Sequence, residues 1–264
     1  CRDGMAHFRI AIDPDARVFA TADRIREFAL WSLDSFARLQ VFAGHQEEVR
    51  GAAFLDRDRL LSVSGDSTAR LWNRQTGALL AVLPTHPLYC LAAHPSGELV
   101  AAGGSAGASG RIDLIDASLR LLRTIDTSIS PATYPPLPAE RVRQLGIVAS
   151  RRDSANVACI AWHPDGMRLV TGGWDYVVKM FEAATGACLR RWSGHSHRVT
   201  AIAVSADGNS IASGSSDGQI RLWAAESDAC LATFDRLPGS VEDLLFVDDR
   251  LHAACGDGRV YVVP

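Results

Sequence analysis

Two histidines one residue apart, His195 and His197 in "GHSHR", have the spacing in this chain that most suggests a pair of metal ligands. Zinc sites need at least three protein ligands, drawn from histidine, cysteine and carboxylate side chains. No third ligand is spaced to join this pair. The sequence therefore predicts no metal site at these histidines.

Three other motifs suggest chemistry but lack the residues that would complete it. The glycine-rich "GGSAGASG" at 103–110 is followed by neither a lysine nor a helix, so we interpret it as a widened turn between strands and not as a phosphate loop. "DPDA" and "HPDG" lack the further oxygen ligands of a calcium loop. We expect no catalytic residue, no cofactor and no enzyme activity.

The composition is that of an ordinary globular protein. Of 264 residues, 47% are hydrophobic and 22% are charged, which is enough for a sizeable core. No apolar run approaches the ~18 residues of a membrane-spanning helix. The formal net charge of −3 argues against a general nucleic-acid binder. We expect neither a membrane, a nucleic acid nor a small-molecule substrate as partner.

Six cysteines are scattered along the chain and none forms a Cys-x-x-Cys pair, so a zinc ribbon or redox motif is disfavoured. Five lie in apolar segments, where a free cysteine packs as a small hydrophobic residue. We interpret these five as buried thiols in a reducing, cytoplasmic compartment. They are Cys90, Cys159, Cys188, Cys230 and Cys255.

The elements that hold these residues repeat along the chain. An aspartate precedes an aromatic or apolar residue by six positions in "SGDSTARLW", "GGWDYVVKMF", "SGSSDGQIRLW" and "CGDGRVYVV". Looser copies are "TADRIREFALW" and "GGSAGASGRIDLI". The six copies end at positions 31, 72, 115, 181, 223 and 263, so the period is near 42 residues with one insertion.

Each period contains several short strands. Runs such as "VTAIAVS" and "QIRLWAA" are separated by tight-turn sequences such as "SADG", "HPDG" and "HPSG". Four strands in about 42 residues, repeated, predict an all-β propeller of four-stranded antiparallel blades in a single domain over 1–264. The predicted blades are 7–44, 45–85, 86–126, 156–193, 194–236 and 237–264, with an insertion at 127–155.

These copies resemble the WD-repeat β-propeller family over nearly the whole chain. The resemblance implies that a histidine, a serine, an aspartate and a tryptophan form a structural hydrogen-bonded tetrad. The fourth copy has Phe181 for tryptophan and no Gly-His, the third keeps His86 without the aspartate and tryptophan, and the first and last lack the histidine. The two full tetrads are His45, Ser62, Asp66 and Trp72, and His195, Ser213, Asp217 and Trp223.

Family members usually have seven blades, and the amino terminus usually supplies the outer strand of the last one. The last copy here lacks an outer strand, and an uncovered strand edge invites association. We therefore expect a seventh blade or a closing strand, either upstream of Cys1 or from a partner.

The insertion contains the extended, proline-rich "SPATYPPLP" and is locally basic. Arg141, Arg143, Arg151 and Arg152 outnumber Glu140 and Asp153. A surface loop, a docking element and an extra strand formed by "RQLGIVAS" all remain open as interpretations.

The family resemblance also implies partner contacts, at the residue before each turn aspartate and at residues just ahead of each inner strand. Trp174 stands out because tryptophan is a typical interface anchor. It would alternatively pack under the insertion. The positions in the turns are Trp174, Ser216 and Gly256, and those ahead of the strands are Glu48, Tyr89, Asn156, His197, Arg198 and Ser240.

The sequence thus favours a non-catalytic scaffold that binds a protein or peptide partner on one face of a rigid propeller. The alternative is a carboxy-terminal sensor or regulatory propeller of a larger bacterial enzyme or effector. A propeller enzyme is the third reading, and it lacks the acidic or histidine cluster that it would need.

Overall fold

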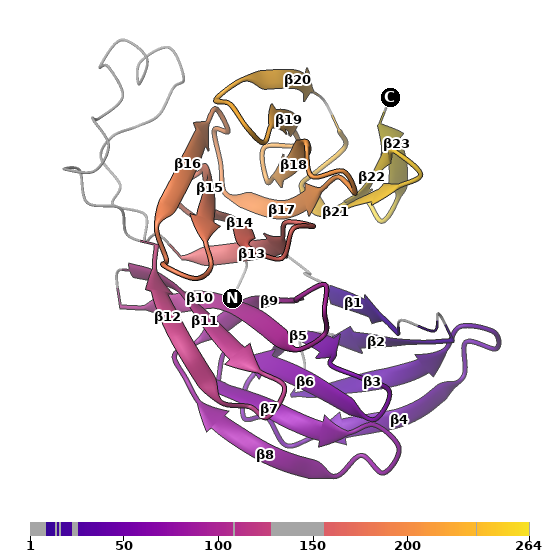
Figure 1. Ribbon diagram of the computed structural model, residues 1–264. Coiled ribbons are helices and arrows are strands. Elements are labelled where there is room, and N and C mark those ends of the chain that lie inside the picture. The colour runs from indigo at the N-terminus through magenta and orange to yellow at the C-terminus, as the bar shows by residue number, and fades with distance from the viewer. Residues whose placement is uncertain are drawn as a thin grey trace. The chain divides into compact units, whose positions relative to one another are not determined.

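The computed structural model describes residues 9–13, 15, 17–22, 26–107, 109–127, 156–235 and 237–263. This part of the chain forms 23 β-strands (Figure 1). It contains no helix long and apolar enough to cross a membrane. Most of the predicted insertion, including its arginines, lies outside the described residues.

The strands form six antiparallel sheets, and strands consecutive in the sequence are neighbours in each sheet. Five sheets have four strands, and the last contains three, β21, β22 and β23. The prediction of an all-β chain built from propeller blades is confirmed. Within each blade the strands are called a, b, c and d in chain order.

The strands of the first three blades are β1 (Arg9–Ile12), β2 (Val18–Ala22), β3 (Glu27–Ser32) and β4 (Arg38–Ala43); β5 (Val49–Phe54), β6 (Arg59–Ser64), β7 (Thr68–Asn73) and β8 (Leu79–Pro84); and β9 (Leu88–Ala93), β10 (Leu99–Ala106), β11 (Ser109–Asp116) and β12 (Leu121–Asp126). Those of the last three are β13 (Val157–Trp162), β14 (Arg168–Gly173), β15 (Val177–Glu182) and β16 (Cys188–Ser193); β17 (Val199–Val204), β18 (Ser210–Ser215), β19 (Ile220–Ala224) and β20 (Cys230–Phe234); and β21 (Val241–Val247), β22 (Arg250–Cys255) and β23 (Val260–Val263).

The chain divides into two compact units. The first comprises Cys1–Ala106 and Ile112–Thr124, and the second Gly107–Arg111 and Ile125–Pro264. In each unit the core lies between neighbouring blades, because one face of every sheet must be covered by the next. Trp72 of the second blade joins a cluster with Phe28 and Phe42 of the first, and Trp223 of the fifth joins one with Trp192 of the fourth.

Small residues on strands b let neighbouring blades approach closely. A Cβ atom on Gly172 would lie 2.3 Å from a methyl of Val199, and one on Gly214 would lie 2.3 Å from a methyl of Val241. Gly172 follows Thr171, and Gly214 follows the tetrad serine Ser213. A glycine at this position of strand b leaves room for strand a of the next blade to pack closely.

The outer strands d are the most exposed of each blade, because one edge and part of one face meet solvent. The prediction that five cysteines are buried is therefore wrong for Cys230, which begins β20 and is exposed. Cys188 begins β16 and is only half-buried. Cys90, Cys159 and Cys255 are buried free thiols.

The tight turns between strands a and b are confirmed, since Gly97, Gly166 and Gly208 have φ values of 74°, 69° and 75°, which favour glycine. The expected widened turn at 103–110 is wrong. β10 and β11 have eight residues each and extend into the glycine-rich stretch, so the extra residues lengthen the hairpin.

The second blade offers a matched test of this core. Leu61 on β6 is fully buried, whereas Leu80 on β8 is half exposed. Leu61→Ala is expected to lower the free energy of unfolding by about 2–5 kcal/mol, because it leaves a cavity in a packed core. Leu80→Ala is expected to cost well under about 1 kcal/mol. Chemical unfolding of both variants measures the difference, and equal losses would contradict this assignment of the core.

Candidate functional site

Polar side chains are buried where the loop ahead of each strand a crosses the b–c turn. In the second blade, His45 Nδ1 lies 2.8 Å from Asp66 Oδ2, and His45 Nε2 lies 2.7 Å from Ser62 Oγ. The Trp72 indole N–H donates to Ser62 Oγ at 2.8 Å. A neutral histidine with its proton on Nδ1 satisfies every bond in this chain, since Ser62 then donates to Nε2 and accepts from Trp72.

The environment shifts the pKa values of the charged pair. Burial alone would raise the pKa of the Asp66 carboxyl, but hydrogen bonds from Thr68, the Gln46 N–H and His45 together hold that pKa at about 2. Burial lowers the pKa of His45 by more than its bond to Asp66 raises it. An ionised aspartate and a neutral histidine are therefore the stable forms at neutral pH.

The fifth blade has the same arrangement with one longer contact. His195 Nε2 lies 2.7 Å from Ser213 Oγ, which accepts the Trp223 indole N–H at 2.8 Å. His195 Nδ1 is 3.5 Å from Asp217 Oδ2, and the Ser196 N–H donates to the same oxygen at 2.9 Å. Burial favours the neutral carboxyl, but His195 and the backbone N–H donors lower the pKa of Asp217 far below its usual range.

In the third blade, the loop histidine pairs with an aspartate inside strand c, a residue that the sequence analysis missed. His86 has no turn aspartate, but its Nε2 lies 3.2 Å from Oδ2 of Asp113, a buried residue in the middle of β11. Thr124 Oγ1 donates to Asp113 Oδ1 at 2.7 Å. The signal in the sequence was an aspartate inside the apolar run "RIDLI".

The fourth blade lacks the histidine and uses a lysine. Lys179 on β15 is 5% exposed, and its Nζ lies 2.5 Å from Asp175 Oδ2. The same ammonium donates to the Thr127 carbonyl, ahead of the blade, at 3.0 Å. One cation thus neutralises the turn aspartate and holds the preceding loop, both of which the histidine does elsewhere.

Two partial networks remain in the first and last blades. The Trp31 indole N–H donates to Thr21 Oγ1 at 2.9 Å, which is the Trp–Ser contact of the full tetrads with threonine for serine. The Tyr261 hydroxyl donates to Asp257 Oδ2 at 2.7 Å. Five blades carry a polar residue at one position of strand c, two residues before the tryptophan or the residue that replaces it. This strand-c polar position comprises Arg70, Asp113, Lys179, Arg221 and Tyr261.

The end of each blade that carries the b–c turn and the loop ahead of strand a is here called its upper face. A main-chain hydrogen bond joins the two segments in the same way in five blades: the residue before the turn aspartate, or its equivalent, donates its N–H to the carbonyl of the residue ahead of strand a. The pairs are Gly65 with Glu48 (3.3 Å), Ser105 with Pro87 (3.1 Å), Trp174 with Asn156 (3.1 Å), Ser216 with Arg198 (3.0 Å) and Gly256 with Ser240 (2.8 Å).

The predicted contact residues are divided between the two units. Glu48 and Tyr89 belong to the first unit. Tyr89 was expected ahead of its strand, but it lies inside β9, where its hydroxyl is 3.0 Å from Ser105 Oγ. Arg50 links the two, because it pairs with Glu48 at 2.9 Å and its guanidinium lies 5.9 Å from the Tyr89 ring. Trp174, Asn156, His197, Arg198, Ser216 and Ser240 belong to the second unit.

The second unit gathers four of its upper-face side chains into one cluster. The guanidinium carbon of Arg198 lies 4.1 Å from the centre of the Trp174 ring, a close cation–π contact. The Tyr176 and His197 rings are 6.5 Å apart. We call Trp174, Tyr176, His197 and Arg198 the aromatic–arginine cluster; His197 is exposed and the other three are half-buried.

Tyr176 was missed by the sequence analysis. Its φ is 66°, in the left-handed region where the fifth and sixth blades have Gly218 and Gly258. A bulky residue in this region costs conformational energy, so its presence points to a requirement for the side chain. A tyrosine where the fifth and sixth copies have glycine and the second has serine was the available signal.

Among the described residues, His, Cys, Asp and Glu side chains form no group of three or more placed to hold a metal ion. The pattern Gly-x-Ser-x-Gly, which carries the nucleophile of α/β-hydrolases on a strand-to-helix turn, occurs at 103–107 and at 214–218. Ser105 lies in β10 and Ser216 in a b–c turn between strands.

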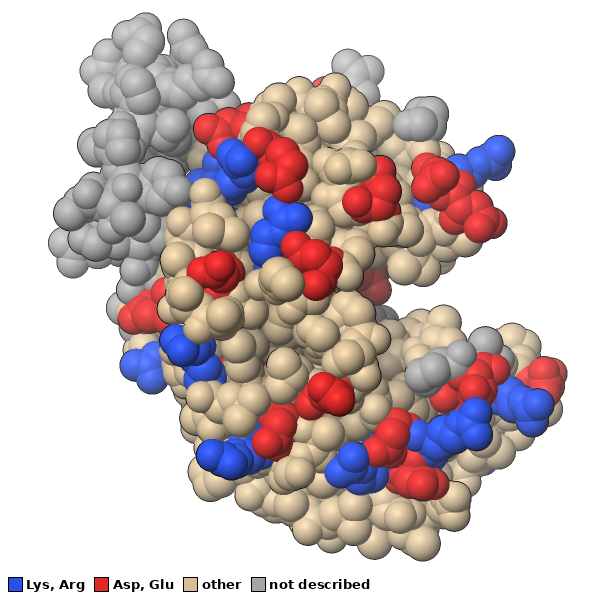
Figure 2. All heavy atoms as spheres, in the orientation of Figure 1, with Lys and Arg blue, Asp and Glu red and all other residues tan. Residues whose placement is uncertain are grey.

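On the face in Figure 2, basic and acidic side chains are interspersed.

Comparison with known proteins places four repeats on this chain. The model of the WD domain, G-beta repeat, matches residues 36–73, 77–116, 147–182 and 186–224. WD repeat-containing protein VIP3 of Arabidopsis thaliana is 28% identical over 171 residues, which are 63% of this chain and 49% of that protein. WD repeat-containing protein 37 of Mus musculus is 26% identical over 188 residues, 69% of this chain and 32% of that protein.

A shorter match is to the tRNA (guanine-N(7)-)-methyltransferase non-catalytic subunit wuho of Drosophila grimshawi. It is 36% identical over 78 residues, 28% of this chain and 20% of that protein. The chain thus spans half or less of the length of these relatives.

The Asp66 network makes stability depend on pH. The folded-state pKa near 2 lies below the ordinary value of 3.8, so the ionised carboxylate stabilises the fold above about pH 4, and this contribution is lost as the pH falls towards 2. The lowered pKa of His45 acts in the same direction below about pH 6.5. Asp66→Asn is expected to remove about 2 kcal/mol of the loss seen on acidification from pH 5 to pH 2. Unfolding curves recorded between pH 5 and pH 2 measure this difference in unfolding free energy. Asp34→Asn, at an exposed position, is the control, and it should keep the pH dependence of the wild type.

Lys179 and Asp175 should depend on one another. Lys179→Met is expected to cost about 1–3 kcal/mol of unfolding free energy, because it removes the ammonium that pairs with the Asp175 carboxylate and donates to the Thr127 carbonyl. Adding Asp175→Asn should recover part of that loss. A double-mutant cycle by chemical unfolding measures the coupling, and additive effects within about 0.5 kcal/mol would refute the pairing.

Proposed function

We propose that this chain, which belongs to the WD-repeat family, is a non-catalytic scaffold that binds a protein or peptide partner on its upper face. The aromatic–arginine cluster of the second unit is the observation that carries the proposal. It brings together the residue types that dominate binding energy at protein interfaces, on a surface made of turns.

The cluster is held in place before any partner arrives. Main-chain hydrogen bonds join Trp174 to Asn156 and Ser216 to Arg198, and His195 of the fifth-blade tetrad is fixed in the same loop by its contact with Ser213. Because the surface is already ordered, binding costs little conformational entropy, and this favours affinity from a small contact area.

Arg198 suggests the chemistry of the partner group. Among the described residues, no carboxylate lies within 4 Å of its guanidinium, whereas Arg50 and Arg70 of the second blade each have one. The planar guanidinium is already oriented by the Trp174 ring. An acidic side chain next to an apolar one in the partner would pair with Arg198 and pack on Trp174.

The name of one relative supports a non-catalytic role. The wuho protein is named as the non-catalytic subunit of a methyltransferase. That name also supports the second candidate, a regulatory propeller that serves a larger enzyme or effector. Both candidates use the upper face, and they differ in whether the bound segment belongs to another protein or to the same one.

Trp174→Ala is expected to weaken partner binding without changing the melting temperature. Peptides selected from a displayed random library on the folded chain provide the ligand. Loss of an interface anchor should reduce affinity by about 2 kcal/mol, or roughly 30-fold in Kd. Titration calorimetry and thermal unfolding measure the two quantities.

Met167→Ala is the matched control, because Met167 is exposed in the a–b turn at the opposite end of the same blade. Its affinity should stay within twofold of the wild type. Selected peptides that are indifferent to Trp174→Ala, or a melting temperature that falls together with affinity, would count against a binding role for this face.

A further inference from the structure

Two loops of the upper face match in length and carry opposite charges. The loop ahead of β5 reads "GHQEEV" and the loop ahead of β17 reads "GHSHRV", so Glu47 and Glu48 occupy the positions of His197 and Arg198. The first loop belongs to the first unit and the second loop to the second unit. One unit therefore presents carboxylates where the other presents an imidazole and a guanidinium.

Arg198 is a cation without a counter-ion. It is half-buried beside the Trp174 ring, and no carboxylate of the described chain lies within 4 Å of its guanidinium. A charge that is partly removed from water gains more from an opposite charge than an exposed one does. Other half-buried arginines have such a carboxylate, namely Arg50, Arg59, Arg70, Arg74, Arg168 and Arg190.

Glu47 is the matching anion. Its side chain is exposed, and no cationic nitrogen of the described residues lies within 4 Å of its carboxylate, whereas Glu48 already pairs with Arg50 at 2.9 Å. A Cβ atom on Gly65 would lie 2.8 Å from Glu47 Oε2, so this carboxylate lies against the b–c turn of its own blade. Because Gly65 has no side chain, the turn leaves the carboxylate open.

The two turns differ in shape as the two loops differ in charge. Gly65 and Trp174 occupy the same position of their turns, since both donate the main-chain hydrogen bond that joins the turn to the loop. The turn of the fourth blade presents an indole beside Arg198, and the turn of the second blade is flat beside Glu47. Opposite charges next to complementary shapes are the features by which two surfaces recognise each other.

We propose that the aromatic–arginine cluster of one copy binds the acidic loop, Glu47 and Glu48, of a second copy of this chain, an inference that rests on the proposed function of the upper face. Arg198 pairs with the Glu47 carboxylate, and the Trp174 indole packs on the Gly65 turn. The opposite charges steer the loops together and fix their register. Each copy carries one cluster and one acidic loop, so pairs and longer chains are both forms of this association.

Self-association competes with any other partner of the cluster. A peptide that pairs with Arg198 and packs on Trp174 takes the place of the acidic loop. By mass action, the concentration of the chain then sets how much of the cluster is open to that partner.

Sedimentation velocity of the whole chain at increasing concentrations measures the association. We expect the average mass of the wild type to rise with concentration. Raising the salt from about 0.05 to 0.5 M should weaken the association about tenfold, because salt screens charges at a surface. Peptides selected for binding to the cluster should return the chain to the monomer.

Charge reversals identify the two surfaces. Arg198→Glu and Glu47→Arg should each stay monomeric, because each places like charges at the contact. An equimolar mixture of these two variants should associate, since each retains the charge that the other has lost. Arg120→Glu and Glu98→Arg are the matched controls, at exposed positions in turns at the opposite end of the blades, and they should associate as the wild type does.

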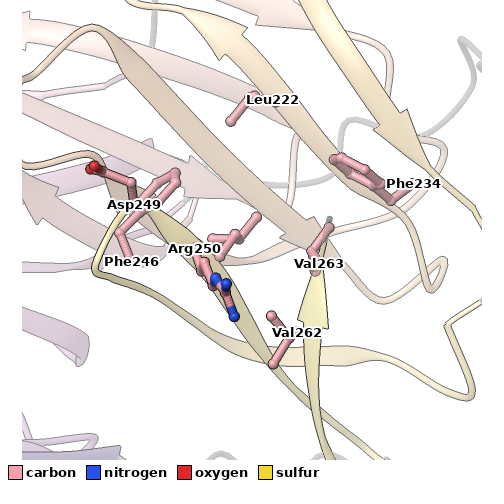
Figure 3. Close-up of a pocket in the computed structure, with 8 residues that line it drawn as sticks. Leu222, Phe234, Phe246, Asp249, Arg250, Val262 and Val263 are labelled. Carbon is pink, nitrogen blue, oxygen red and sulfur yellow. The ribbon is translucent and has the colours of Figure 1, made fainter.

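The cavity between the fifth and sixth blades is the alternative contact between copies. Figure 3 shows this space of about 430 Å³, with Leu222, Phe234 and Val263 among the residues around it. No residue of the cluster or of the acidic loop lines it. Association through this mostly apolar cavity would therefore persist in Arg198→Glu and would change little with salt.

Three results would overturn the inference. The first is a wild-type chain that sediments as a monomer at every concentration in low salt, a measurement that needs no variant. The second is association of Arg198→Glu equal to that of the wild type. The third is a mixture of the two charge reversals that stays monomeric although both variants keep the wild-type melting temperature. In each case, selected peptides that lose affinity in Trp174→Ala would still support the proposed function, so the two conclusions fail separately.

Discussion

The structure depends on the need to satisfy polar groups that are buried where each loop crosses its blade. A carboxylate or imidazole without a partner at this depth would cost more than most single contacts contribute. Each blade with such a group therefore supplies a counterpart, and the counterpart can come from three places: the loop, the turn or the strand-c polar position. Asp113 and Lys179 occupy the same strand-c position with opposite charges. Asp113 pairs with His86 of its loop, and Lys179 pairs with Asp175 of its turn.

This freedom explains how repeats with little sequence in common keep one geometry. What the fold preserves is a junction between loop and hairpin in which a buried charged group lies close to a polar partner, and not a particular set of four residues. The upper face is built directly on these junctions. Its side chains are presented by turns that hydrogen bonds have already fixed, and a rigid display is what a binding scaffold requires.

The sequence was sufficient for the repeat, the strands and the blade type, because periodic hydrophobicity and turn residues are local signals. It was not sufficient for contacts that depend on register. Asp113 was missed because it lies within a strand and not in the turn where the repeat places its aspartate, and Tyr89 was misplaced because β9 begins at Leu88, two residues earlier than expected. Cys230 was assigned to the core because an outer strand reads as apolar while facing solvent.

The main-chain hydrogen bond that joins each turn to the loop ahead of strand a has an evolutionary consequence. It uses no side-chain atom, so the two residues that it connects remain free to vary while their positions stay fixed. Gly65 and Trp174 donate the same main-chain hydrogen bond, although one has no side chain and the other carries a large indole. A lineage of such proteins can therefore change what it recognises one blade at a time, by substitutions that leave folding almost untouched.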